Sequence, residues 1–226
     1  MKYIVLDTET TGLKRMPKGR IVEPTGLSYA GDSVVQLGAV VADENFGIYK
    51  AICVFNDVVK AYSDPKAEEV NGLNLSVIRS RLSGVTLAQN IEKYLPEFYD
   101  PHVCFIGYNI DFDMDMIAQT TRNYRVVTPP RKYMIPRRPQ EGRITVDIAE
   151  YFAKTGAGGR KYHSKLVDAC RGYEDVVQET FGDINRMMFT NFPELYKQNG
   201  NGYHSALYDS VATYCLWRAR VCPIWK

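Results

Sequence analysis

The hydrophobic residues of this chain gather in short apolar runs that alternate with longer amphipathic segments. The first run, Tyr3 to Leu6, is rich in β-favouring residues and predicts a buried strand. Ser33 to Ala42 and Phe46 to Phe55 are two more β-rich runs, and the three polar residues between them predict a hairpin. Thr86 to Phe98 begins with a Thr-x-x-Gln capping box and carries one apolar stripe, which predicts a helix.

The second half of the chain continues the alternation. Val103 to Ile106 and Ile144 to Val146 predict the remaining buried strands, and a helix is expected near Phe112 to Gln119. Gly156 to Gly159 is expected to be a flexible joint. Ser205 is expected to cap a final helix that runs to about Arg220. Together these elements predict an α/β protein, with a mixed sheet covered by helices.

Composition narrows the class of protein. The chain has 226 residues, of which 45% are hydrophobic and 24% charged, so we expect one globular domain over residues 1–226 rather than a disordered chain. The net charge is only +2, and any attraction to nucleic acid must therefore be local.

Cysteine usage and hydropathy bear on the compartment. The five cysteines include no Cys-x-x-Cys pair, which favours buried free thiols and a reducing environment. The N-terminal apolar run is interrupted by Asp7, and no apolar stretch approaches the length of a membrane span. We therefore predict a cytoplasmic protein.

Two loop segments, at about residues 13–32 and 122–143, interrupt the regular pattern and are rich in basic residues, glycine or proline. The first fits either a solvated surface loop or a basic flap that touches a phosphate backbone. The second favours guidance of a nucleic-acid strand over a solvated surface, because Arg and Lys contacts to phosphate dominate nucleic-acid affinity. Its candidate phosphate-binding residues are Arg131, Lys132, Arg137 and Arg138.

Two carboxylates end the first predicted strand. Asp7 and Glu9 are two residues apart, so their side chains share one face of the strand. Adjacent buried carboxylates repel each other, and divalent cations such as Mg²⁺ relieve this repulsion because they prefer oxygen ligands. The pair therefore indicates a metal site.

Two further motifs, far along the chain, strengthen this interpretation. The three motifs are Asp7-Thr8-Glu9-Thr10-Thr11, Tyr108-Asn109-Ile110-Asp111-Phe112-Asp113 and His204-Ser205-Ala206-Leu207-Tyr208-Asp209. In this order they resemble the motifs of the DnaQ-like 3′–5′ exonucleases of the DEDDh group, across nearly the whole chain. Tyr108 stands where the family often has His, which leaves the closing Asp113 in place.

The resemblance implies a ribonuclease H-like fold, in which a five-stranded mixed β-sheet is flanked by α-helices and carries the site at the ends of its central strands. It implies a single exonuclease domain that releases nucleoside 5′-monophosphates from the 3′ ends of single-stranded DNA or RNA with two Mg²⁺ ions, for which Mn²⁺ can substitute. The expected metal ligands are Asp7, Glu9, Asp113 and Asp209.

The remaining expected roles also come from the resemblance. His204 is the general base, carried on a loop just ahead of the last helix, and Thr10, Leu13 and Asn109 contact the substrate. Two alternatives stay open at this point. One is a proofreading subunit that acts with a separate DNA polymerase. The other is a catalytically silent nucleic-acid-binding protein with the same fold.

Overall fold

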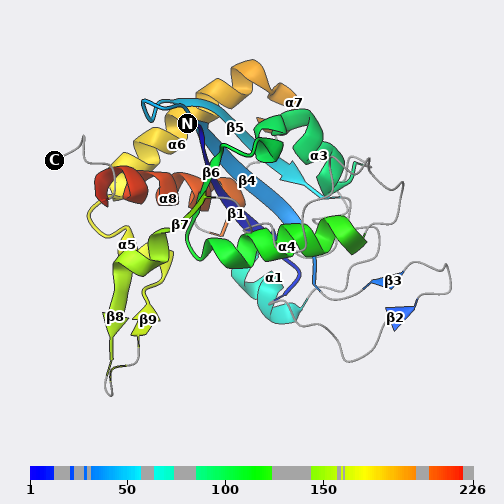
Figure 1. The fold of residues 1–226 in the computed structure, drawn as a ribbon, viewed down its shortest axis with the longest axis horizontal. Coiled ribbons are helices and arrows are strands. Elements are labelled where there is room, and N and C mark those ends of the chain that lie inside the picture. The colour runs from blue at the N-terminus through cyan, green and yellow to red at the C-terminus, as the bar shows by residue number, and fades with distance from the viewer. Residues whose placement is uncertain are drawn as a thin grey trace.

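The computed structural model describes residues 1–12, 21–22, 28–29, 32–56, 64–73, 85–123, 144–156, 159, 161–196 and 204–220. Within them lies a five-stranded sheet in the order β5-β4-β1-β6-β7 (Figure 1). The strands are β1 (Tyr3–Thr10), β4 (Val34–Ala42), β5 (Ile48–Phe55), β6 (Cys104–Gly107) and β7 (Ile144–Asp147). β4 runs antiparallel to β1 and β5, whereas β1, β6 and β7 are parallel, so the predicted mixed sheet is confirmed.

Helices cover both faces of this sheet. The α-helices are α1 (Pro65–Asn71), α3 (Leu87–Tyr94), α4 (Ile110–Asn123), α5 (Leu166–Ala169), α6 (Glu174–Asn191), α7 (Pro193–Tyr196) and α8 (Ala206–Arg220). Short 3₁₀ helices are η1 (Pro96–Tyr99) and η3 (Ile148–Phe152). Two separate ribbons pair β2 (Ile21–Val22) with β3 (Ser28–Tyr29), and β8 (Ala153–Thr155) with β9 (Lys161–His163). No helix in the described part of the chain is long and apolar enough to cross a membrane.

The alternation of side chains along β1 shows which helix lies on which face. Asp7 pairs with Gly38 of β4, so both residues face the same side, where the start of α8 packs against Gly38. Thr8 faces the other side, and its hydroxyl donates to Asp113 of α4 at 2.6 Å. α8 and α4 therefore cover opposite faces, and every residue of β4 between them is buried.

The start of α8 approaches β4 unusually closely at Gly38. A Cβ at this position would lie 2.2 Å from the backbone of Ala206 and Leu207. Two hydrogen bonds fix the contact: Ala206 N donates to Gln36 Oε1 at 3.0 Å, and Ser210 Oγ donates to the Gly38 carbonyl at 3.0 Å. Only glycine fits here, and this close approach sets the position of the first turn of α8.

We expect Gly38→Ala to destabilise the protein by about 1–3 kcal/mol, because the added methyl group must displace the backbone of α8. Urea denaturation followed by circular dichroism measures this change. Gly47→Ala is the matched control, since its Cβ would come no closer than 3.5 Å to the Asp43 side chain. Equal stabilities of the two variants would contradict the close packing.

Several predicted boundaries differ from the structure. The capping box at Thr86 and Gln89 is confirmed, but α3 ends at Tyr94 because Pro96 disfavours the helical conformation of the residue before it. Ser205 precedes α8 as predicted, and its carbonyl accepts from Asp209 N at 2.9 Å, but its side chain does not cap the helix. Its hydroxyl is buried without a hydrogen-bond partner in the described residues, and Gln36 instead accepts from the first N–H of the helix.

The glycine- and proline-rich regions can be compared with expectation only in part. β8 and β9 pair on either side of the predicted flexible joint at 156–159, of which residues 157 and 158 lie outside the described residues. Part of the predicted loop at 13–32 forms the β2–β3 ribbon, and the rest of that loop lies mostly outside the described residues, as does nearly all of 122–143.

Candidate active site

The sequence-predicted carboxylates of β1 lie near its carboxyl end. Asp7 and Glu9 pair with Gly38 and Gln36 of β4, so both side chains point to the face on which α8 begins. Asp7 is half-buried and Glu9 is buried. The strand thus presents two carboxylates side by side at the edge of the core.

Asp113 reaches β1 from the first turns of α4. β6 pairs with β1 only as far as Val5, so the N–H of Thr8 has no strand partner on that side. Asp113 Oδ1 accepts from Thr8 N at 3.0 Å and from Thr8 Oγ1 at 2.6 Å. The carboxylate therefore takes the place of a neighbouring strand and is held beside Asp7 and Glu9.

His204 and Asp209 come from the start of α8. His204 lies in the turn before the helix, as predicted, and has a left-handed φ of 67°. Its backbone N–H donates to Asp209 Oδ2 at 3.1 Å. Potential ligand atoms of Glu9, His204 and Asp209 all lie within 4.8 Å of one another. A non-glycine residue in this backbone region is uncommon, and such residues often lie at functional sites.

The other oxygen of Asp209 differs from Oδ2 in its hydrogen bonding. Asp209 Oδ1 is buried and accepts no hydrogen bond from any residue that the structure describes. A buried carboxylate oxygen without a donor is costly, and a bound cation would satisfy it. The donor set, in which carboxylates predominate, suits a hard divalent cation such as Mg²⁺.

The electrostatics of the cluster lead to the same conclusion. Burial, followed by repulsion from Asp113, Asp209 and Glu9, raises the pKa of Asp7 well above its ordinary value. Burial and repulsion from Asp209 and Asp113 raise the pKa of Glu9 to about 8. The pKa values of Asp113 and Asp209 rise to about 7, mainly because these groups are buried. A cation among the four would allow all of them to ionise near neutral pH.

These shifts predict that the metal-free protein loses stability as pH rises. The carboxyl groups ionise near pH 4 when unfolded but only near pH 7–8 when folded, so their stabilising contribution is complete below about pH 4 and is lost as pH rises to about 8. Since 1 kcal/mol moves Tm by about 2–4 °C at this size, we expect Tm in EDTA to be lower at pH 8 than at pH 5 by at least about 5 °C.

Differential scanning calorimetry between pH 5 and pH 8 tests this expectation. Saturating Mg²⁺ should flatten the pH dependence, and Asp209→Asn should weaken it without metal. A Tm in EDTA that stays constant over this range would show that the carboxylates ionise normally in the folded protein.

A cavity of about 650 Å³ opens beside the carboxylates, between the end of β1 and α1. Thr10, Val70, Asn71 and Phe112 are among the residues that line it. Thr10, a predicted substrate contact, thus lies in its wall. The apolar side chains of Val70 and Phe112 give the cavity surfaces on which a flat base could pack.

Asn71 is a site residue that sequence reasoning missed. Its Nδ2 donates to the Thr10 carbonyl at 3.1 Å, and its side chain also hydrogen-bonds to Glu9, which partly offsets the rise in the pKa of Glu9. Its Oδ1 accepts from Leu73 N at 2.9 Å. In the structure Gly72 ends α1 with a left-handed φ of 67°, an ordinary helix C-terminus, so nothing local in the sequence marks Asn71 as a site residue.

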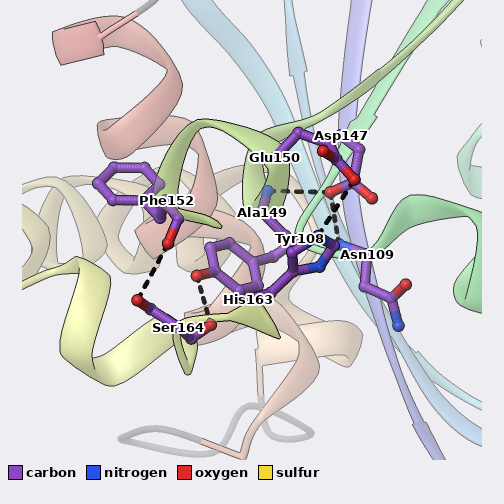
Figure 2. Close-up of polar contacts among 8 residues, drawn as sticks. All are labelled: Tyr108, Asn109, Asp147, Ala149, Glu150, Phe152, His163 and Ser164. Carbon is purple, nitrogen blue, oxygen red and sulfur yellow. Dashed lines mark hydrogen bonds and ion pairs between the residues drawn. The ribbon is translucent and has the colours of Figure 1, made fainter. Parts of the chain in front are cut away.

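The loop after β6 carries two more residues of the second motif (Figure 2). The Tyr108 hydroxyl donates to the Ser164 carbonyl at 2.6 Å, and the backbone N–H of Asn109 donates to Asp147 Oδ1 at 2.8 Å. The Asn109 side chain, a predicted substrate contact, is exposed, and its backbone is left-handed with φ 70°. The other predicted contacts, Leu13, Arg131, Lys132, Arg137 and Arg138, lie outside the described residues.

Comparison with known proteins gives one family and one fold. The model of the RNase_T exonuclease family matches residues 4–216. Exonuclease I from E. coli, solved in complex with a dA16 oligonucleotide, is 17% identical with a TM-score of 0.54, and the alignment covers 99% of this chain and 42% of that protein. A moderately thermophilic Exonuclease I from Methylocaldum szegediense is 16% identical with a TM-score of 0.54, with the same coverage.

At this identity the two structures bear on the fold alone, and they confirm the predicted ribonuclease H-like architecture. This chain spans 42% of the length of each. No curated protein matches the sequence at a significant level.

Proposed function

Because this chain belongs to the RNase_T exonuclease family, we propose that it is a metal-dependent 3′–5′ exonuclease acting on single-stranded nucleic acid. The observation that carries this proposal is the convergence of Asp7, Glu9, Asp113 and Asp209 from three separate elements. They meet beside a cavity large enough for a nucleotide.

Asp7, Glu9, Asp113 and Asp209 would hold two Mg²⁺ ions, for which Mn²⁺ can substitute. When bound, such ions activate the attacking water and neutralise charge on the phosphate and the leaving oxygen. Two observations support this assignment. A cation would bind Asp209 Oδ1, which has no hydrogen-bond donor among the described residues, and it would offset the repulsion that raises the pKa of Glu9.

His204 acts as the general base in this proposal. Its backbone N–H is tied to Asp209 while its side chain stays exposed, so the imidazole can approach the water that attacks the phosphorus. The imidazole accepts the proton from that water as the bond between phosphorus and the 3′-oxygen breaks. The released 3′-oxygen takes a proton from solvent, and the imidazole later gives its own proton to solvent. The product is a nucleoside 5′-monophosphate.

Thr10 and Leu13 contact the terminal nucleotide, and Arg131, Lys132, Arg137 and Arg138 bind phosphates further along the strand. The cavity supports the first part, because Phe112 and Val70 offer apolar surfaces to the terminal base. Stacking tolerates every base, so little sequence preference is expected. The complex of E. coli Exonuclease I with a dA16 oligonucleotide supports a single-stranded substrate.

The deciding experiment uses matched DNA and RNA 20-mers that carry a 5′ label. With Mg²⁺ we expect a ladder that shortens one nucleotide at a time, with mononucleotides as the products, and no cleavage in EDTA. A 3′-labelled strand should lose its label in the first step. Binding without cleavage in Mg²⁺ or Mn²⁺ would identify a silent nucleic-acid-binding protein, and activity that appears only with an added DNA polymerase would indicate a proofreading subunit.

A further inference from the structure

The β8–β9 ribbon is exposed on both faces. It projects from the body of the protein next to α5 (Figure 1). Lys154, Thr155, Lys161, Tyr162 and His163 are all exposed. A two-stranded ribbon is marginally stable in water, so contacts at its base must hold it.

Three polar contacts supply this support (Figure 2). The Tyr108 hydroxyl donates to the Ser164 carbonyl at 2.6 Å, and Ser164 Oγ donates to the Phe152 carbonyl at 3.1 Å. His163 Nε2 lies 3.1 Å from Glu150 Oε1. The base of the ribbon is therefore fixed to the loop that follows β6.

The same loop leads into the candidate active site. Asn109 N donates to Asp147 Oδ1 at 2.8 Å, and Asp147 ends the strand from which the ribbon continues. Asp147 is also near enough to Asp113 for the two carboxylates to repel each other. The base of the ribbon and the candidate metal ligand Asp113 are therefore connected through Asp147.

The ribbon and its base carry a local excess of positive charge. Residues 150–165 contain four basic residues and one acidic residue, a net charge of +3, whereas the whole chain carries +2. The basic residues are Lys154, Arg160, Lys161 and Lys165, and the acidic residue is Glu150. Such a local excess attracts phosphates even though the whole protein is nearly neutral.

The two faces of the ribbon differ. Lys154 pairs directly with Tyr162, so these two side chains share one face, and Tyr162 is 53% exposed. Lys161 and His163 share the opposite face, where His163 is engaged with Glu150. The first face thus joins a cation to an exposed aromatic ring, the combination that binds a phosphate together with a stacked base.

We propose that the Lys154–Tyr162 face of the β8–β9 ribbon binds single-stranded nucleic acid outside the catalytic cavity and guides it toward the carboxylates. Lys154 contacts a backbone phosphate, and Tyr162 stacks on a base. This inference rests on the proposed exonuclease function and names a second contact surface for the same substrate.

Binding of a fluorescent single-stranded 15-mer, with Ca²⁺ in place of Mg²⁺, tests the proposal. Tyr162→Ala should weaken binding about tenfold, and Tyr162→Phe should retain it, because stacking needs the ring and not the hydroxyl. A plot of log K against log salt has a negative slope, and Lys154→Ala should make that slope shallower by about 0.7, the contribution of one phosphate on a single strand. Lys161→Ala is the matched control and should change affinity less than about twofold.

Substrate length separates this proposal from the proposed function. For Tyr162→Ala, the ratio of kcat/KM on the 15-mer to that on a dinucleotide should fall about tenfold, because a dinucleotide is too short to reach the ribbon. Equal losses of kcat/KM on both substrates would make the ribbon only a support for the site and would overturn the proposal. Wild-type binding of the 15-mer by both Tyr162→Ala and Lys154→Ala would also overturn it. If the wild type hydrolyses neither substrate, the proposed function fails, and the binding comparison still decides the role of the ribbon.

Discussion

Asp7→Asn should lower kcat with Mg²⁺ by about a thousandfold while the fold stays intact. The carboxylate of Asp7 is repelled by those of Asp113, Asp209 and Glu9, so it interacts with all three. Charge stabilisation by bound cations is worth several kcal/mol in the transition state, and each 1.36 kcal/mol corresponds to a tenfold rate change. Asparagine keeps the shape but removes the charge that holds the cation.

The same substitution should have the opposite effect on the stability of the metal-free protein. Removing one negative charge from the cluster relieves repulsion, so Tm in EDTA should rise at pH 8, whereas the gain in Tm on adding Mg²⁺ should shrink. Calorimetry with and without Mg²⁺, alongside kcat on a labelled strand, gives both readouts. Asp111→Asn is the control, because Asp111 is exposed in the first turn of α4 and should change neither.

If Asp7→Asn and the wild type gain equal stability from Mg²⁺, Asp7 is not a metal ligand. If activity persists within a few-fold of wild type, the carboxylates do not carry the reaction. Either outcome would move the chemistry away from the end of β1.

His204→Ala should lower kcat by about 10²–10⁴-fold, the typical contribution of a general base. A base must be neutral to accept a proton. At saturating Mg²⁺, which keeps the carboxylates ionised, wild-type kcat should therefore rise with pH as the base loses its proton. That limb should disappear in the variant. A pH–rate profile of both proteins on one strand measures the effect.

The position of His204 requires a second measurement, because one of its ring nitrogens lies within 4.8 Å of carboxylate oxygens of Glu9 and Asp209. Calorimetric titration with Mn²⁺ separates a base from a ligand. We expect His204→Ala to bind Mn²⁺ as the wild type does, whereas Asp209→Asn should bind it much more weakly. Loss of Mn²⁺ affinity in His204→Ala would make the histidine a ligand and leave the base to another group.

Tyr208 is a poor substitute for this base. Its hydroxyl accepts from Gln178 Nε2 at 2.8 Å, and its ring packs edge-on against Phe181 of α6. The side chain thus points toward α6. If His204→Ala remained fully active, the simpler explanation would be that the metal-bound water ionises without a protein base.

Elements that depend on patterns among neighbouring residues were predictable from the sequence. The apolar run before Asp7 determines β1, since a run of β-favouring residues acts over a few neighbours. The same holds for the β4–β5 hairpin and for the capping box of α3. Because alternation along a strand is strict, the shared face of Asp7 and Glu9 also followed from spacing alone.

The tertiary structure alone decided how distant residues meet. Asp113 is oriented by Thr8, 105 positions away, because β6 ends early and leaves an N–H to be satisfied. Gln36 rather than Ser205 satisfies the first N–H of α8, from 170 positions away, because the close approach at Gly38 brings the two elements together. Neither contact leaves a local pattern, since a hydrogen bond across the sheet depends on where strands end and how closely helices pack, not on neighbours in sequence.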